Sequence, residues 1–310
     1  MKPETVQRWA FALLLVTPAL WSANYLVARL APGEIAPHML ALCRWALAAT
    51  VLGVFAFPEL KAKRHLILKN AWHYLVLGAL GMWICGAWVY IGARSTSATN
   101  IALIYSLSPA FIVLCASMWL HEKLRDIQWL GIALAFAGLI HVVIRGQWGN
   151  LLEVRFVPGD LWIVACAFSW AAYALLMKKW PTDFSPMARL VLTAIGGCIV
   201  LLPFTVIEAV SGLPLTQTLW GWKSFALIAL AGLVPGAFAY WAYSTAQKTL
   251  GAARTAMALY MGPLYGALLG WVFLGETVTG YHAIGALLIL PGLYLASYSH
   301  SGHQSAATKS

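Results

Sequence analysis

The stretch ALYMGPLYGALLGWVFLGETV, residues 258–278, decides the fold because the chain contains a second stretch built to the same plan. That stretch is LIYSLSPAFIVLCASMWLHEKL, residues 103–124. Each is an apolar run with a proline near its start and a glutamate at its end, and Pro263 follows Pro109 by 154 positions. The same offset separates Glu122 from Glu276, Gly131 from Gly285, and Gly138 from Gly292.

The earlier part of the chain repeats at a slightly smaller offset. Trp170 follows Trp21 by 149 positions, and Pro186 follows Pro37 by the same number. The sequence is therefore predicted to consist of two halves that arose as duplicates.

The composition places the chain in a membrane. Hydrophobic residues occupy 61% of the 310 positions and charged residues only 10%, whereas soluble domains are about a quarter charged. Apolar stretches of about 20 residues, long enough to cross a hydrocarbon core as a helix, recur throughout. We expect ten spans near residues 9–30, 36–57, 71–92, 97–120, 126–144, 159–179, 186–206, 222–245, 253–274 and 280–298.

Each span is expected to be helical, because lipid offers no partner to unpaired backbone N–H and C=O groups. The alternating pattern of a membrane β-barrel is absent from the sequence. The prediction is thus an all-α integral membrane protein with ten transmembrane helices in two inverted five-helix repeats. We place the first repeat at 1–147, the second at 148–300 and a disordered tail at 301–310.

An odd number of helices per repeat makes the second copy enter the membrane from the opposite side. Inverted repeats are typical of transporters whose halves rock about a site near the bilayer midplane to give alternating access. Most of the 20 Lys and Arg residues fall on one side of the predicted spans, which predicts that both termini are cytoplasmic. Attraction to the anionic inner leaflet then explains the net charge of +10. We expect no nucleic-acid partner and no obligate protein partner.

Several stretches resemble the EamA family of the drug/metabolite transporter superfamily. They are SPAFIVLCASMWLHEKL and GPLYGALLGWVFLGETV, LCRWALAA in the second span, and LGIALAFAGLI and IGALLILPGLY, which close the two halves. The resemblance implies ten helices and the export of amino acids or related metabolites across the bacterial inner membrane. FSWAAYALLMKKW, residues 168–180, is also similar to a helix of YddG-like aromatic amino-acid exporters. Export of purines, sugar phosphates or drug-like molecules is the alternative.

The spans carry many aromatic residues away from their ends. Tyr105 and Tyr260 occupy nearly equivalent places shortly before the two repeated prolines. A tyrosine hydroxyl in hydrocarbon needs a polar partner, so we expect both to face a cavity or another helix. An aromatic-lined cavity suits a large, partly apolar substrate, although packing is the alternative role. The aromatic residues predicted to bind substrate are Trp21, Tyr90, Tyr105, Trp170, Tyr173, Tyr240 and Tyr260.

Arg44 lies well inside the second predicted span, where an ionisable residue is a functional candidate. It either holds a substrate carboxylate or pairs with a backbone carbonyl or with a loop acid such as Glu34. Asn24, in the first span, offers an amide that either orients the substrate or bonds another helix. Both residues are included in the predicted substrate site.

The repeated prolines are predicted hinges. Pro109 and Pro263 each remove a backbone donor and free the carbonyl one turn earlier, which produces either a hinge or an inert kink. Gly262 and Gly266 belong to a stripe of small residues that lets helices pack closely or slide past each other. We assign these four residues to hinge movement or gating.

The acidic residues all fall at or near predicted span ends. The sequence therefore offers no buried carboxylate as a proton relay, which favours facilitated export or exchange over proton antiport. Glu122 and Glu276 are each expected to cap the helix that follows them.

Nothing in the sequence indicates a metal or cofactor site. The five cysteines lie in separate apolar spans and are expected to be small buried hydrophobic residues. The motifs HxxxD and HExxH are absent, so a membrane enzyme is less consistent with the sequence than a transporter.

Overall fold

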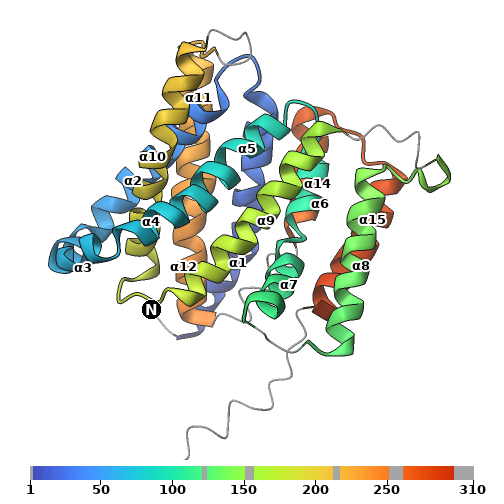
Figure 1. The fold of residues 1–310 in the computed structure, drawn as a ribbon, viewed down its shortest axis with the longest axis horizontal. Coiled ribbons are helices and arrows are strands. Elements are labelled where there is room, and N and C mark those ends of the chain that lie inside the picture. The colour runs from blue at the N-terminus through green and yellow to red at the C-terminus, as the bar shows by residue number, and fades with distance from the viewer. Residues whose placement is uncertain (1–2, 121–123, 151–156, 212–216, 251–260, 297–310) are drawn as a thin grey trace, which may run out of the picture.

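The computed structural model is built from helices, which confirms the predicted fold class. It describes residues 3–120, 124–150, 157–211, 217–250 and 261–296 (Figure 1). In these ranges, eight helical stretches are long and apolar enough to cross a membrane, and Gly262–Leu274 and Gly280–Ala296 are shorter apolar helices. Each of the ten predicted spans overlaps one of these ten segments.

Several spans consist of more than one helical segment, for example the third, which joins α4, η1 and α5. The first half contains α1 (Pro3–Leu30), α2 (Pro37–Ala62), α3 (Arg64–Lys69), α4 (Ala71–Gly78), η1 (Ala79–Ile84), α5 (Cys85–Gly92), α6 (Ala98–Tyr105), α7 (Ser108–Leu120) and α8 (Asp126–Val143). The second half contains η2 (Trp148–Asn150), α9 (Pro158–Lys179), α10 (Pro186–Val210), α11 (Trp222–Ala231), η4 (Gly232–Phe238), α12 (Ala239–Leu250), α14 (Gly262–Leu274) and α15 (Gly280–Ala296).

The helices α2 and α10 run antiparallel, and a glutamate near the end of each caps the start of the other. Glu208 accepts hydrogen bonds from the backbone N–H groups of His38 and Met39 at 2.9 and 3.2 Å. Glu59 accepts one from the backbone N–H of Ser185 at 2.8 Å. A carboxylate at this place binds N–H groups that have no partner within the helix. Glu59 and Glu208 are 149 positions apart, so the repeat offset relates the two caps.

Glycines bring α8 and α15 together, and Figure 1 shows the two helices side by side. A Cβ atom on Gly131 would lie 2.6 Å from the carbonyl oxygen of Gly292, and one on Gly138 would lie 3.0 Å from that of Gly285. Only glycine allows the two backbones to approach so closely. The pairing is antiparallel, as two inverted halves require. Gly131 lies against Gly292, the repeat equivalent of Gly138, and Gly138 lies against Gly285, the repeat equivalent of Gly131.

Two π-helical segments interrupt the α-helices at matching places. They are η1 in the third span and η4 in the eighth, and a shift of 154 positions carries Ala79–Ile84 onto residues 233–238. Such segments are rare and are frequently found at functional sites. Both adjoin the helices that carry the central polar and aromatic residues described below, since α5 follows η1 and α12 follows η4.

Large apolar side chains cover much of the surface. Phe55, Val210 and Trp222 are between 71% and 77% exposed, whereas Leu40 and Tyr90 are almost fully buried. Exposed apolar surface on this scale marks a membrane or protein contact. Lipid against these side chains is consistent with the apolar spans that carry them.

Candidate functional site

A buried arginine, an asparagine and a tyrosine meet where α1, α2 and α5 adjoin. The Arg44 Nη1 atom donates hydrogen bonds to Asn24 Oδ1 and to the Tyr90 hydroxyl oxygen, both at 2.7 Å. The Tyr90 hydroxyl donates in turn to Asn24 Oδ1 at 2.9 Å. The structure therefore brings together three residues that the sequence assigned to the substrate site, and we call them the Arg44 triad.

The charge of Arg44 is buried among neutral groups. Arg44 is only 6% exposed, and its Nε atom has no hydrogen-bond partner. Among the described acids none forms an ion pair with it, and the suggested pairing with Glu34 is wrong because Glu34 binds Lys223 at 3.0 Å. The guanidinium carbon lies 4.6 Å from the centre of the Trp45 ring, a cation–π contact that replaces part of the lost hydration.

Aromatic residues of the second half complete the surroundings of the triad. The Tyr240 ring on α12 lies 5.4 Å from Trp21 on α1 and 6.2 Å from Trp45 on α2, measured between ring centres. The Tyr243 ring lies 5.2 Å from Trp21, also measured between ring centres. Trp21, Tyr240 and Tyr243 are only partly buried. One charged group and several rings from both halves therefore share one region of the bundle.

Tyr105, at the end of α6, has the polar partner that its position predicts. Its hydroxyl donates to the carbonyl oxygen of Cys85 at 3.0 Å and lies 3.1 Å from the sulfur of the same residue. Its ring stacks on Tyr25 with centres 5.9 Å apart. Tyr260, the equivalent residue in the second half, lies outside the described residues.

Trp170 and Tyr173 on α9 stack on each other with ring centres 5.0 Å apart. The Tyr173 ring also packs against η1, where a Cβ atom on Gly81 would lie 3.0 Å from it. The pair therefore borders η1, the segment directly before the helix α5 that carries Tyr90.

The sequence did not assign Trp45, Tyr25 or Tyr243 to the site. Tyr25 and Tyr243 are aromatic residues within spans, which is the signal that selected the other candidates. Trp45 has a weaker signal, namely its place directly after Arg44 in a span. Its contact with the guanidinium depends on side-chain directions that the sequence pattern does not specify.

All four residues of the predicted hinge set lie within the described residues. Pro109 is the second residue of α7, and the Tyr105 carbonyl that it frees accepts a hydrogen bond from the Ser108 hydroxyl at 2.7 Å. Pro263 is likewise the second residue of α14. In both cases the proline stands in the first turn of a helix, where its missing N–H costs little.

The glycines beside Pro263 have different surroundings. A Cβ atom on Gly266 would lie 2.2 Å from the Cβ of Ala102, so α14 touches α6 at this point. A Cβ on Gly262 would meet nothing within 4 Å, although its carbonyl oxygen accepts a hydrogen bond from Ser22 at 3.2 Å. Close packing therefore explains Gly266 but not Gly262.

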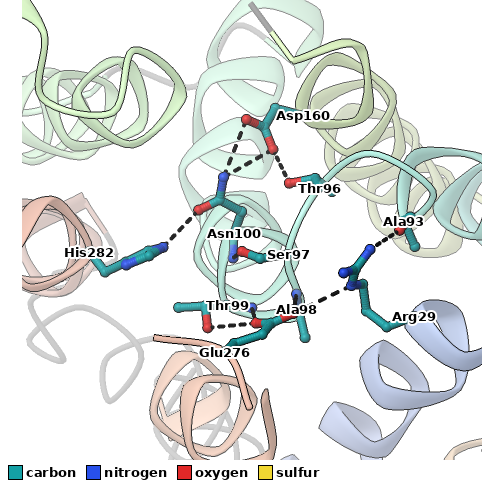
Figure 2. A network of polar contacts seen from close by, with 10 residues as sticks. All are labelled: Arg29, Ala93, Thr96, Ser97, Ala98, Thr99, Asn100, Asp160, Glu276 and His282. Carbon is teal, nitrogen blue, oxygen red and sulfur yellow. Dashed lines mark hydrogen bonds and ion pairs between the residues drawn. The ribbon is translucent and has the colours of Figure 1, made fainter. Parts of the chain in front are cut away.

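Glu276, in the connection between α14 and α15, binds the start of α6 (Figure 2). Its carboxylate accepts hydrogen bonds from the backbone N–H groups of Ala98 at 2.8 Å and Thr99 at 3.2 Å, and from the Thr99 hydroxyl at 3.1 Å. The Nε atom of Arg29 lies 3.4 Å away on α1. We call the end of the bundle that holds these contacts the Glu276 end. Here a single carboxylate fastens the second half to the first.

The prediction that Glu276 caps the following helix is wrong. The next helix, α15, is capped from within, because His282 Nδ1 accepts a hydrogen bond from the backbone N–H of Thr279 at 3.0 Å. The free N–H groups of α6 come from a different half of the chain, a packing relationship that local sequence does not reveal. Glu122 lies outside the described residues.

A second polar network stands beside Glu276, as Figure 2 shows. The Asp160 carboxylate accepts hydrogen bonds from the Thr96 hydroxyl and from Asn100 Nδ2, the latter at 3.2 and 3.3 Å. Asn100 Oδ1 lies 3.1 Å from His282 Nε2. Since an amide oxygen only accepts and the Thr279 N–H already donates to Nδ1, the histidine is neutral and carries its proton on Nε2.

The expectation of no buried carboxylate is wrong for Glu208, which is 8% exposed, and above all for Asp160, which is 0% exposed. It lies near a span end, as predicted, but the start of α9 packs tightly on the end of α5. A Cβ atom on Gly159 would lie 2.3 Å from the carbonyl oxygen of Gly92. Nearness to a span end therefore did not mean contact with water at this position.

Within the described residues no group of three or more His, Cys, Asp or Glu side chains is arranged to hold a metal ion. All five cysteines are free and at least partly buried. Cys85 does more than fill space, because it is the partner of Tyr105.

Comparison with known proteins decides the family. The model of the EamA-like transporter family matches residues 8–144 and again 157–298, nearly the whole chain in two blocks. The chain belongs to the EamA-like transporter family. As an EamA protein it is a membrane transporter, since the members and the relatives below are named transporters rather than enzymes.

This EamA protein is similar to curated proteins along most of its length. It is 26% identical to the "Uncharacterized transporter YyaM" of Bacillus subtilis, with 93% of each chain covered. It is 24% identical to an "Uncharacterized transporter" of Archaeoglobus fulgidus, covering 92% of this chain and 96% of that one. It is also 24% identical to the "Uncharacterized inner membrane transporter YedA" of Escherichia coli, with 92% of each covered.

A solved crystal structure shares the fold. It superimposes with a TM-score of 0.59 at 18% sequence identity, covering 95% of this chain and 96% of the other. At this identity the likeness concerns the arrangement of helices alone. The relatives therefore establish a transporter and leave its substrate to the chemistry of the central residues.

Proposed function

We propose that this EamA protein exports amino acids, aromatic and other neutral ones, or related small metabolites by alternating access. The observation that carries the proposal is the Arg44 triad, a buried cation surrounded by rings from both halves. A guanidinium binds carboxylates well, and aromatic rings bind the apolar part of a ligand. The similarity of α9 to YddG-like exporters supports an aromatic substrate.

The repeated caps and π-segments support alternating access. Glu59 and Glu208 occupy equivalent places and join α2 to α10 at both ends, which is the internal symmetry between halves that alternating access uses. At the Glu276 end, Glu276 joins the halves and must release α6 for that end to open. We assign hinge movement to the segments around Pro109 and Pro263, the latter together with Gly262 and Gly266.

The proposed location is the inner membrane, with both termini in the cytoplasm. The distribution of Lys and Arg supports this orientation, and the name of the Escherichia coli relative mentions that membrane. In this orientation the Glu276 end faces outward. Export of purines, sugar phosphates or drug-like molecules is the competing proposal, since most of the site is aromatic rather than charged.

Counterflow in liposomes tests the proposed function. The purified protein is reconstituted with unlabelled phenylalanine inside, and uptake of labelled phenylalanine, tryptophan, methionine and threonine is measured with protein-free liposomes as the control. We expect saturable uptake that unlabelled aromatic compounds inhibit. Flux that grows linearly with concentration would indicate a channel, and no uptake of any of these or of related carboxylates would refute the proposed substrate class.

A further inference from the structure

We propose that the central site takes a carboxylate that carries a ring and has no ammonium group, so that export moves one net negative charge outward. This inference rests on the proposed function and narrows its substrate class. Among amino acids and related metabolites, it selects the related aromatic monoanions over zwitterions.

The hydrogen-bonding capacity of the triad favours an anionic ligand. Asn24 Oδ1 accepts from both Arg44 and Tyr90, so both of its lone pairs are in use. The Tyr90 hydroxyl accepts from Arg44 and donates to Asn24. The one acceptor site left in the triad is the second lone pair of the neutral Tyr90 hydroxyl, beside the guanidinium, so the triad offers a ligand ammonium no charged acceptor. It does hold a free donor, Arg44 Nε, which is buried and unpaired in a residue that is 6% exposed.

The distribution of charge in the protein also favours an anionic ligand. Every described acid is engaged elsewhere or lies exposed at a helix end. Glu34 pairs with Lys223, Glu59 with Lys63 and Ser185, Asp160 with Thr96 and Asn100, Glu208 with His38, and Glu276 with Arg29 and α6, while Asp126 and Asp183 are exposed. The side chains of the remaining acids, Glu4, Glu122 and Glu153, are outside the described residues, at positions that the sequence places near span ends or in loops.

One bound anion would neutralise the positive charge of Arg44. A buried guanidinium without a counter-charge is costly, and a carboxylate from the ligand removes that cost. A zwitterion would supply the carboxylate but would also bury an ammonium beside the guanidinium, and the triad supplies no negative group to balance it. The rings of Trp21 and Tyr240 then contact the apolar part of the ligand, beside Trp45.

A consequence follows for the energy source of export. A monoanion that leaves a cell with a negative interior moves down the membrane potential. At about 100 mV this potential holds a monoanion at about a fifty-fold excess outside at equilibrium. The potential does not act in this way on a net-neutral zwitterion. The proposed selectivity therefore makes export electrogenic without any coupled proton.

The test uses three ligands with the same phenyl ring. L-3-phenyllactate is a monoanion, L-phenylalanine is its zwitterionic near-isostere, and phenethylamine lacks the carboxylate. Binding is measured by tryptophan fluorescence of the purified full-length protein. Efflux of labelled phenyllactate and phenylalanine is measured from proteoliposomes with and without a potassium diffusion potential, inside negative, after subtraction of leak from protein-free liposomes.

The expected result is that phenyllactate binds at least about tenfold more tightly than phenylalanine, the effect of one lost charged hydrogen bond. Phenethylamine should bind most weakly, and the potential should accelerate efflux of phenyllactate. Arg44→Gln should abolish the preference, and Arg44→Lys should retain it because lysine keeps the positive charge that attracts the carboxylate. Lys223→Gln is the control, since it removes one positive charge from an exposed pair elsewhere.

Saturable transport of phenylalanine that exceeds that of phenyllactate and ignores the potential would overturn this inference and leave the proposed function standing. Retention of the phenyllactate preference in a folded Arg44→Gln variant would also overturn it. Absence of saturable transport for every carboxylate and amino acid would refute the proposed function as well.

Discussion

Glu276→Gln should weaken closure of the Glu276 end. The carboxylate accepts from two backbone N–H groups and one hydroxyl, and it lies 3.4 Å from Arg29 Nε. Glutamine keeps one acceptor oxygen but loses the negative charge that faces a helix start and a guanidinium. A charged cap contributes about 1–2 kcal/mol and the helix dipole up to about 2 kcal/mol. We expect a loss of about 2 kcal/mol, which shifts the equilibrium towards the open end about thirty-fold.

Distance measurements between two spin labels report this shift. Ser95 and Thr277 are exposed positions on the two connections that Glu276 holds together, so each can carry a label. Pulsed electron spin resonance on the reconstituted protein gives the distribution of distances between them. Glu34→Gln is the matched control, because Glu34 lies at the same end but pairs with a Lys223 side chain that is 58% exposed. Such a surface pair contributes only about 0–1 kcal/mol.

The expected result is a longer-distance population that grows strongly in Glu276→Gln and stays nearly unchanged in Glu34→Gln. Equal distributions in the two variants would show that the Glu276 contacts do not hold this end closed. The thermal stability of both variants in detergent shows whether each remains folded before labelling.

Three further substitutions probe other contacts. Gly197→Ala should prevent close packing of α10 on η1 and greatly reduce the yield of folded protein, because the new Cβ would lie 2.4 Å from the Met82 Cβ, whereas Gly149→Ala, with nothing within 4 Å, should leave the yield unchanged in size-exclusion chromatography. Tyr90→Phe should lower the affinity for phenyllactate about tenfold in fluorescence titrations, because Arg44 and Asn24 each lose a hydrogen-bond partner. An unchanged affinity would show that the triad is not part of the substrate site. Asp160→Asn should lower the melting temperature through a loss of about 1–3 kcal/mol, and an equal or higher melting temperature would show that the buried charge does not stabilise the fold.

The sequence predicted the helices well because their signal is local. Each span is an apolar run long enough to cross the membrane, so its helix can be predicted from the residues of that run alone. The repeat could also be predicted, since residues such as Pro109 and Pro263 keep one offset. The inverted arrangement then follows from an odd number of spans.

The partners of individual side chains were harder to predict. Arg44, Asn24 and Tyr90 were each selected as unusual residues within spans, but their mutual contacts depend on how α1, α2 and α5 turn towards each other. The same limit explains why Glu276 was assigned to the following helix rather than to α6, and why Asp160 was expected to reach water. Such assignments require the packing of helices that are distant in sequence.

The central claim is that the site between the halves opens alternately to the two sides of the membrane. A direct test introduces Tyr240→Cys into a functional protein whose five native cysteines have been replaced. Reaction with a membrane-impermeant maleimide is then measured in sealed vesicles from each side. We predict that the cysteine reacts from both sides and that Glu276→Gln increases its reaction from the Glu276 end. Reaction from one side alone, in a protein that still shows saturable transport, would contradict alternating access at this site.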